Sequence, residues 1–209
     1  METEHLISFI GASVILTIMP GPDIIFVLTE SLTKGHKNGI AISSGLCSGL
    51  LIHTLAAATG LSLIIQKSAL AFSIVKYLGA GYLFYLALRS IKDKKLSVEF
   101  KLKGTNEKKS FLQLMRKGFF MNVLNPKVSL FFIAFLPQFI SKEGCGVTFQ
   151  MLILGMIFMI QAILIFITVS ILSGRLTKFV NSPRFWKITK WSKVSVLSGL
   201  GLTLALSKK

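Results

Sequence analysis

The sequence predicts an all-α polytopic membrane protein whose six transmembrane helices form two inverted three-helix repeats. Two observations lead to this fold class, the sparse charge and the length of the apolar runs. Of the 209 residues, 52% are hydrophobic and 15% are charged, whereas a soluble domain carries about 25% charged residues. The run from Gly144 to Gly174 has no charged side chain, and about 20 apolar residues suffice to cross the hydrocarbon as a helix. This composition excludes a secreted disulfide scaffold, a disordered chain and an ordinary cytosolic enzyme.

Six stretches are apolar enough to be transmembrane helices. We expect the first three to form one repeat within residues 1–89 and the last three a second repeat within 118–209, joined by a Lys-rich cytoplasmic loop at 90–117. The sixth stretch is the weakest, because a short apolar run separates Lys193 from Lys208. The six helices are predicted at about 6–30, 40–66, 68–89, 118–141, 146–174 and 191–207.

The distribution of the 24 basic residues sets the predicted orientation. Most of them lie in the loops that follow the first, third and fifth helices. Because cytoplasmic loops of membrane proteins are enriched in Lys and Arg, we expect these loops in the cytoplasm and both termini outside. The net charge of +16 is then explained by topology and by contact with anionic lipid, and no nucleic-acid partner is expected. The two repeats run in opposite directions, the arrangement in which transporters bind substrate at the repeat interface.

The first helix of each repeat is predicted to be broken. Proline removes a backbone donor and clashes with the preceding turn, and glycine loosens a helix further. Directly after each break stands an ionisable residue, Asp23 in the first helix and Lys127 in the fourth. At the helical rise these two residues lie about 12 Å and about 14 Å from the cytoplasmic edge, which places opposite charges at nearly one depth. The breaks are expected at Pro20, Gly21 and Pro22, and at Pro126.

The two charges admit two interpretations. A lone charge at this depth costs about 3 kcal/mol on insertion scales, so Asp23 and Lys127 are expected to pair or to face a wet cavity. In the functional interpretation they bind substrate and protons together with Asn122 and Asn125, which flank the second break. In the alternative they form a structural ion pair that holds the two repeats together.

A face of small residues follows on the second predicted helix. Gly45, Gly49 and His53 are spaced by four residues and therefore share one helix face. Glycines there predict close packing against another helix, within the chain or against a second copy, which leaves a homodimer open. His53 would lie buried at that contact and is a candidate proton carrier, whereas Gln161 is expected to hydrogen-bond between helices. No cluster with metal-ligand spacing occurs, so no metal or cofactor is predicted.

Several motifs occur in order along nearly the whole chain. They are Pro20-Gly21-Pro22-Asp23, Gly45-x3-Gly49-x3-His53, the run from Val75 to Leu83, Asn122-x2-Asn125-Pro126-Lys127, and the run from Phe135 to Phe139. With these motifs the chain resembles the LysE/RhtB family of bacterial amino-acid exporters, the lysine exporter and homoserine/threonine resistance translocators. The resemblance implies a secondary transporter of the bacterial inner membrane rather than an enzyme. Its substrates would be amino acids or their derivatives of the threonine, homoserine, leucine or lysine class, exported by proton antiport.

The residues and the resemblance together suggest a mechanism. The helix end after Pro126, with Lys127, would attract the substrate carboxylate. Asp23 and carbonyls freed before Pro20 would hold the ammonium group, and Asp23, with or without His53, would exchange the driving proton. The competing hypotheses are an exporter of an inorganic cation, a membrane-embedded enzyme and an assembly protein. The first two need a ligand cluster or a nucleophile–base set, which the predicted helices do not supply.

Overall fold

The computed structural model of the chain is all-helical in the residues that it describes, which are 3–61, 68–91, 110–141, 145–180 and 182–206. These residues form eight α-helices, two π-helical turns and one 3-10 turn. The α-helices are α1 (Thr3–Ile18), α2 (Pro22–Lys34), α3 (His36–Ala56), α5 (Ala69–Ile91), α6 (Phe111–Val123), α7 (Pro126–Leu130), α8 (Val147–Val180) and α9 (Pro183–Leu206). The π-helical turns are η1 (Ala57–Leu61) and η2 (Phe131–Phe135), and the 3-10 turn is η3 (Leu136–Phe139).

Several helices have the length and composition of membrane spans. Three helical segments, within α3–η1, α5 and α8, are each long and apolar enough to cross a membrane on their own. Two further pairs of helical segments are long and apolar enough when taken together, but each pair is bent at its break. Helices α1 and α2 meet at an angle of 55°, and α6 meets the segment from Pro126 to Phe139 at 49°. The described residues therefore give three spans, or five if each bent pair is counted as one. The weakest predicted span, 191–207, corresponds to α9 and is not among them, so the six-helix inverted repeat stays a prediction.

Two predicted boundaries differ from the structure around the Lys-rich loop. The third helix continues to Ile91, and α6 begins at Phe111 rather than at 118. The early start has a local cause, since the Ser110 side chain accepts from the Gln113 backbone N–H while the Gln113 side chain accepts from the Ser110 N–H. This capping box initiates a helix within the predicted loop. The loop residues 92–109 lie outside the described residues.

The helix boundaries near the fifth and sixth predicted spans also differ. The fifth helix, α8, continues past 174 to Val180, and α9 begins at Pro183 instead of 191. Lys and Arg are good helix formers, so a helix can extend beyond an apolar run into a basic segment. Proline at the first position then starts α9, because its missing N–H would have no helical partner there. Of the second predicted helix, residues 62–66 lie outside the described residues.

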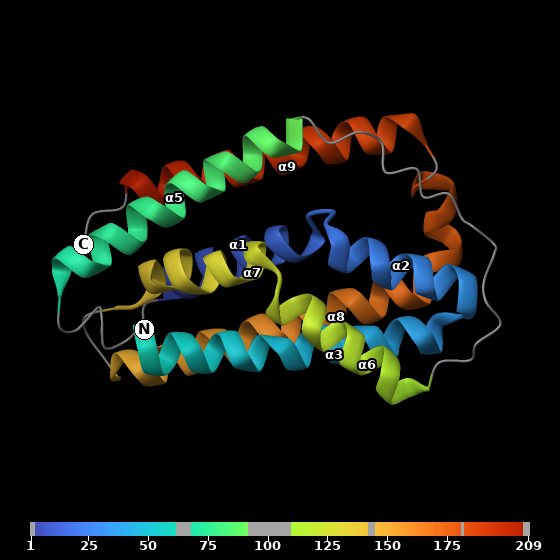
Figure 1. Cartoon of the computed structure of the whole chain (residues 1–209), viewed down its shortest axis with the longest axis horizontal. Coiled ribbons are helices and arrows are strands. Elements are labelled where there is room, and N and C mark those ends of the chain that lie inside the picture. The colour runs from blue at the N-terminus through green and yellow to red at the C-terminus, as the bar shows by residue number, and fades with distance from the viewer. Residues whose placement is uncertain (1–2, 62–67, 92–109, 142–144, 181, 207–209) are drawn as a thin grey trace.

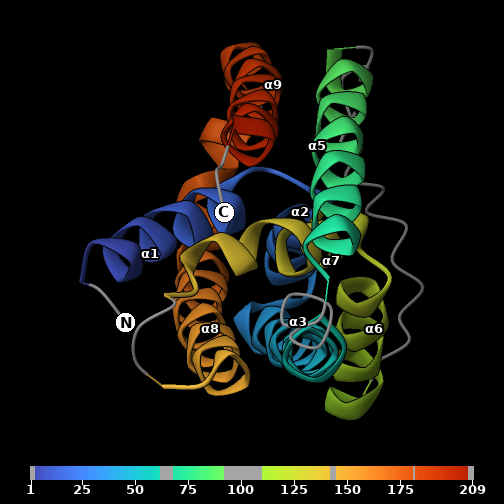
Figure 2. The same cartoon turned by 90° about the vertical axis from the view of Figure 1, so that its left-hand side faces the viewer.

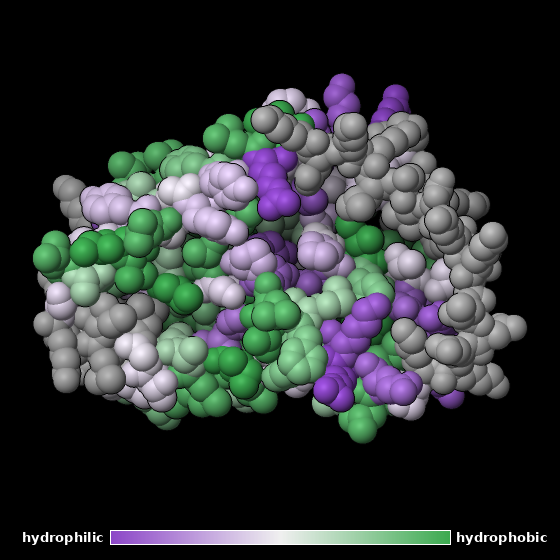
Figure 3. Space-filling view, in the orientation of Figure 1, coloured by the Kyte–Doolittle hydropathy of each residue, from purple (hydrophilic) through white to green (hydrophobic). Residues whose placement is uncertain are grey.

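The helical segments run back and forth along the long axis of the molecule (Figure 1). The broken helix α1–α2 runs toward one end and α3 returns beside α6 and α8 (Figures 1 and 2). Helices α5 and α9 pack against each other at one side, where the Gly201 Cα faces the Ala80 carbonyl (Figure 2). On the face shown in Figure 3, hydrophobic side chains gather toward the left end, and hydrophilic ones lie at the centre and to the right of it. Helix α6 carries the exposed residues Arg116 and Lys117.

A cluster of phenylalanine rings fixes α1 against α8 and the irregular turns η2 and η3. Phe9 of α1 lies 5.9 Å from Phe131 and 5.3 Å from Phe139, measured between ring centroids. Phe158 of α8 lies 5.2 Å from Phe131 and 5.3 Å from Phe132. These separations are typical of favourable aromatic pairs. The cluster thereby holds η2 and η3, which follow the second break, close to α1, the helix that precedes the first break.

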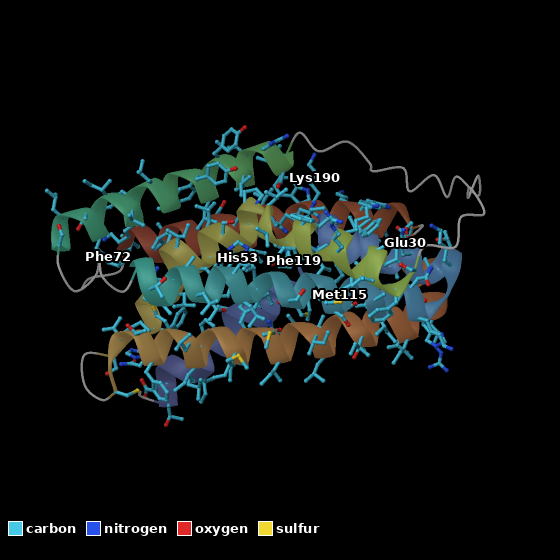
Figure 4. All side chains as sticks on the ribbon, turned by 60° about the horizontal axis from the view of Figure 1, so that its bottom comes forward. Glu30, His53, Phe72, Met115, Phe119 and Lys190 are labelled. Carbon is cyan, nitrogen blue, oxygen red and sulfur yellow. The ribbon has the colours of Figure 1, made fainter. Side chains whose placement is uncertain are left out.

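Helices α3 and α6 approach each other through glycines on both sides. A Cβ added to Gly45 would overlap the Met115 carbonyl oxygen, and one added to Gly118 would overlap the Ile42 carbonyl. A Cβ on Gly49 would lie 2.8 Å from the Asn122 side-chain oxygen. Figure 4 shows Met115 where α6 lies along α3. The predicted face of Gly45 and Gly49 thus packs against α6 of the same chain and brings Asn122 next to α3.

Gly45→Ala should destabilise the protein because the obstructing atoms belong to rigid backbone. Overpacking of this kind costs about 1–3 kcal/mol, which thermal unfolding of the purified protein in detergent can measure. The matched control is Gly11→Ala in α1, where an added Cβ has nothing within 4 Å. Equal thermal stability of the two variants would contradict the close α3–α6 contact.

Candidate functional site

The two helix breaks meet at a pocket in the centre of the molecule. Its walls come from α1, α2, α3, α6, α7 and α8, so both broken helices contribute. The free volume is about 10 Å³, roughly the room of one water molecule. Most of the lining is apolar, and the polar residues stand at the breaks or beside them. The lining residues are Leu16, Thr17, Asp23, Leu50, Asn122, Lys127, Val128, Phe158, Ala162 and Phe166.

Asn125 connects the two charged residues of the pocket. Its side-chain Nδ2 donates to Asp23 Oδ2 at 2.5 Å, and its Oδ1 accepts from the Lys127 backbone N–H at 3.0 Å. Asn125 is therefore both the N-cap of α7 and a link to the first turn of α2. Asp23 and Lys127 are close enough to interact electrostatically. They nevertheless form no ion pair within 4.0 Å in the part of the chain that the structure describes, so the link between them is the Asn125 amide.

The first break has a freed carbonyl that Lys127 occupies. In a continuous helix the Leu16 carbonyl would accept from the backbone nitrogen of residue 20, which here is proline and has no hydrogen. The Lys127 Nζ donates to this carbonyl at 3.0 Å. The same amine lies against Gly21, since an added Cβ there would be 3.5 Å from Nζ. Lys127 thus reaches from the second broken helix into the break of the first.

The second break has a comparable partner from α3. Pro126 cannot donate to the Asn122 carbonyl, which instead accepts from the Asn125 backbone N–H at 2.9 Å and from His53 Nε2 at 3.2 Å. A carbonyl oxygen can only accept, so Nε2 must carry the proton. The His53 ring also packs 5.7 Å from the Phe132 ring, centroid to centroid. Figure 4 shows His53 near the middle of the long axis, although it does not line the pocket.

Three buried side-chain oxygens near the pocket find no hydrogen-bond donor among the described residues. Asp23 Oδ1 and Asn122 Oδ1 belong to residues that line the pocket, and their residues are 4% and 3% exposed. The third is Gln161 Oε1, whose amide nitrogen donates to Thr17 Oγ1 at 2.9 Å. Buried polar atoms are nearly always hydrogen-bonded. Two of these acceptors belong to residues that line the pocket, so a hydrogen-bond donor bound there could satisfy them.

The structure brings together most of the residues singled out from sequence, with two differences. Asp23, Asn122 and Lys127 line one pocket, and Asn125 joins two of them. His53 stands behind the pocket, bound to backbone. The helix end after Pro126 offers no free donor, because the first N–H of α7 that proline leaves is already bound by Asn125. The cationic group that α7 itself carries is Lys127 Nζ.

The wall formed by α8 was not predicted from sequence. Phe158, Ala162 and Phe166 are spaced by four residues and face the pocket as one stripe. Helix α8 is apolar around its whole circumference, so no hydrophobic periodicity indicates which face points inward. The one polar side chain in its middle, Gln161, could have signalled the inner side, since it bonds to Thr17 of α1.

Comparisons with known proteins agree with a membrane translocator. The chain is 31% identical over 210 residues to an uncharacterized membrane protein, YrhP, of Bacillus subtilis, covering 98% of this chain and 100% of that protein. It is 28% identical over 208 residues to a homoserine/homoserine lactone efflux protein of Salmonella typhimurium, covering 100% of this chain and 99% of that one. A membrane protein of Vibrio cholerae is 26% identical over 210 residues, with both chains covered completely. No solved structure matches.

The family assignment rests on a match across nearly the full length. The sequence model described as LysE type translocator matches residues 14–208, which include both helix breaks and every residue that lines the pocket. The resemblance inferred from the ordered motifs is confirmed by this match. The chain is a membrane protein that belongs to the family of LysE type translocators.

Proposed function

We propose that this translocator exports amino acids or close derivatives from the cytoplasm in exchange for protons, and that the central pocket binds them. The observation that carries the proposal is a buried pocket with an acid and an amine, Asp23 and Lys127, at two helix breaks. Intramembrane charges beside unwound backbone are typical of substrate and ion paths. An α-amino acid carries the complementary pair of charges.

The pocket can satisfy both charges of a zwitterion. Asp23 Oδ1 and Asn122 Oδ1 have no donor among the described residues, and an ammonium group would supply hydrogens to both. The Lys127 amine has three hydrogens, one of which points to the Leu16 carbonyl, so others remain for a substrate carboxylate. Charge-assisted hydrogen bonds of this kind are about twice as strong as neutral ones. They would offset the loss of water from the substrate in the membrane interior.

The lining favours substrates with uncharged side chains. Apart from Asp23 and Lys127, the lining residues carry no charge, so a second ammonium or carboxylate would be buried without a partner. The Salmonella relative is named for efflux of homoserine and homoserine lactone, and homoserine has a neutral side chain. We place the substrate side chain against the stripe of Phe158, Ala162 and Phe166.

Proton coupling follows from competition at one carboxylate. An ionised Asp23 attracts the substrate ammonium, whereas a protonated Asp23 has no charge to offer it. Proton and substrate therefore exclude each other, and each lowers the affinity for the other by the same factor. Export requires that the pocket change the side to which it opens between the two occupancies. We retain the predicted orientation, with the basic loops in the cytoplasm and both termini outside the inner membrane.

The described conformation leaves too little room in the pocket for an amino acid. A free volume of about 10 Å³ holds about one water molecule, so the walls must separate to admit an amino acid. The break between α1 and α2, the break before α7 and the π-helical turn η2 interrupt regular helix on two sides of the pocket. Such interruptions are common at functional sites and are where helices bend.

Asp23→Asn should abolish proton-driven export and lower exchange by about tenfold or more, because the neutral amide cannot charge-pair with the ammonium. The measurement is counterflow of labelled L-homoserine in proteoliposomes, with and without an imposed pH gradient. Glu30→Gln is the matched control, since Glu30 is a buried acid of the same helix that pairs with Lys34 at 3.3 Å and lies outside the pocket. Undiminished coupling in Asp23→Asn would remove Asp23 from the mechanism.

Ala162→Leu should discriminate between substrates by size, because a larger side chain fills the space between Phe158 and Phe166. We expect the apparent affinity for L-leucine to fall by about tenfold, a cost of about 1.4 kcal/mol, with a smaller change for L-alanine. The matched control is Ala56→Leu, which makes the same substitution at an exposed position of α3. Equal losses for both amino acids would contradict a side-chain subsite at Ala162.

A further inference from the structure

Each helix break is capped by a side chain from the other predicted repeat. The Leu16 carbonyl, freed by Pro20 in the first repeat, accepts from Lys127 Nζ of the second repeat at 3.0 Å. The Asn122 carbonyl, which loses its helical donor at Pro126 in the second repeat, accepts from the Asn125 backbone N–H at 2.9 Å and also from His53 Nε2 of the first repeat at 3.2 Å. Each of these carbonyls stands four residues before a proline, and in a regular helix the N–H at the proline position would be its donor. The arrangement is reciprocal.

We propose that Lys127 and His53 are reciprocal caps of the two breaks, and that His53 acts as a positioning residue rather than as a carrier of the driving proton. In transporters with discontinuous helices, freed carbonyls coordinate bound Na⁺. Here the tethered ammonium of Lys127 occupies that position at the first break, so export requires no Na⁺. This last clause rests on the proposed function, whereas the capping itself does not.

The surroundings of Lys127 support a cation seated in the break. The amine lies beside Gly21, since an added Cβ there would be in van der Waals contact with Nζ at 3.5 Å. Asp23, two residues further along, interacts with the amine electrostatically. A freed carbonyl and a nearby carboxylate are the oxygen ligands that suit a bound cation. The chain supplies that cation from its own second broken helix.

The surroundings of His53 support a cap rather than a proton relay. His53 is 9% exposed and packs against the Phe132 ring, and its Nε2 hydrogen is donated to the Asn122 backbone carbonyl. It does not line the pocket. Its neighbour Gly49 faces Asn122 closely, with 2.8 Å between an added Cβ and Oδ1. His53 thus fixes Asn122, a residue that lines the pocket.

Double-mutant cycles on thermal unfolding test the capping without any transport. Pro20→Ala restores the missing N–H, so Lys127→Met should lower the melting temperature much less in that background than in the unchanged protein. Pro126→Ala should protect against His53→Leu in the same way. The crossed pairs, Pro20→Ala with His53→Leu and Pro126→Ala with Lys127→Met, are the matched controls and should be additive. Additive effects in both direct pairs would overturn the proposal.

Substitutions of His53 separate a cap from a proton carrier. His53→Gln keeps a side-chain N–H donor but cannot carry a proton between groups, whereas His53→Leu loses both properties. We expect counterflow of labelled L-homoserine to fall by less than about threefold in His53→Gln and by about tenfold or more in His53→Leu. Equal loss of pH-gradient coupling in both variants would assign proton transfer to His53 and overturn its role as a cap.

Replacement of Na⁺ by choline tests the tethered cation. Homoserine counterflow by the unchanged protein should proceed at equal rates in the two media, and a requirement for Na⁺ would overturn this clause. If the unchanged protein exchanged no amino acid in either medium, the proposed function would fail. The unfolding cycles would still decide the capping, so the two failures are distinguishable.

Discussion

A proline inside a membrane helix leaves the carbonyl four residues earlier without its helical donor, and this constraint organises the centre of the protein. In water the solvent would satisfy the carbonyl, but in hydrocarbon an unsatisfied backbone group costs several kcal/mol. The break at Pro20 therefore requires a donor from elsewhere in the fold, which Lys127 supplies, whereas at Pro126 the Asn122 carbonyl keeps the Asn125 backbone N–H and gains His53 as a second donor. The glycines of α3 and α6 serve the same constraint, because close approach of these helices carries His53 to the second break.

The pocket differs from the breaks in what it leaves unsatisfied. The freed carbonyls of Leu16 and Asn122 have donors, whereas the side-chain oxygens Asp23 Oδ1 and Asn122 Oδ1 have none among the described residues. Asn125 binds one oxygen of Asp23, and the other has no donor among the described residues. The Leu16 and Asn122 carbonyls are thus satisfied by protein, whereas these side-chain oxygens remain available to a donor from outside the described residues. A rigid break beside an open acceptor is the preorganisation that binding sites need.

The sequence predicts the two helix breaks well, because proline chemistry is local. Asp23 and Lys127 were expected to lie close together, and both line one pocket. The link through Asn125 could not be foreseen, because it depends on side-chain direction at the N-cap of α7. The contribution of α8 to the pocket could not be predicted for another reason, since an apolar helix has no polar face that would show which side points inward. The loop boundary at 117 was wrong because the Ser110–Gln113 capping box lies among lysines that also suit a solvated loop.

Substrate binding and opening of the pocket make different demands on Lys127. The ammonium has enough hydrogens to hold the Leu16 carbonyl and a substrate carboxylate at once, so binding need not disturb the first cap. Opening is different, because both caps cross between the predicted repeats. Any movement of one repeat against the other that widens the pocket must stretch both contacts together. Loss of the Lys127 contact would leave the Leu16 carbonyl without its donor, which is costly in the membrane, whereas the Asn122 carbonyl would keep the Asn125 N–H. The cap at the first break therefore opposes such a movement more strongly than the cap at the second.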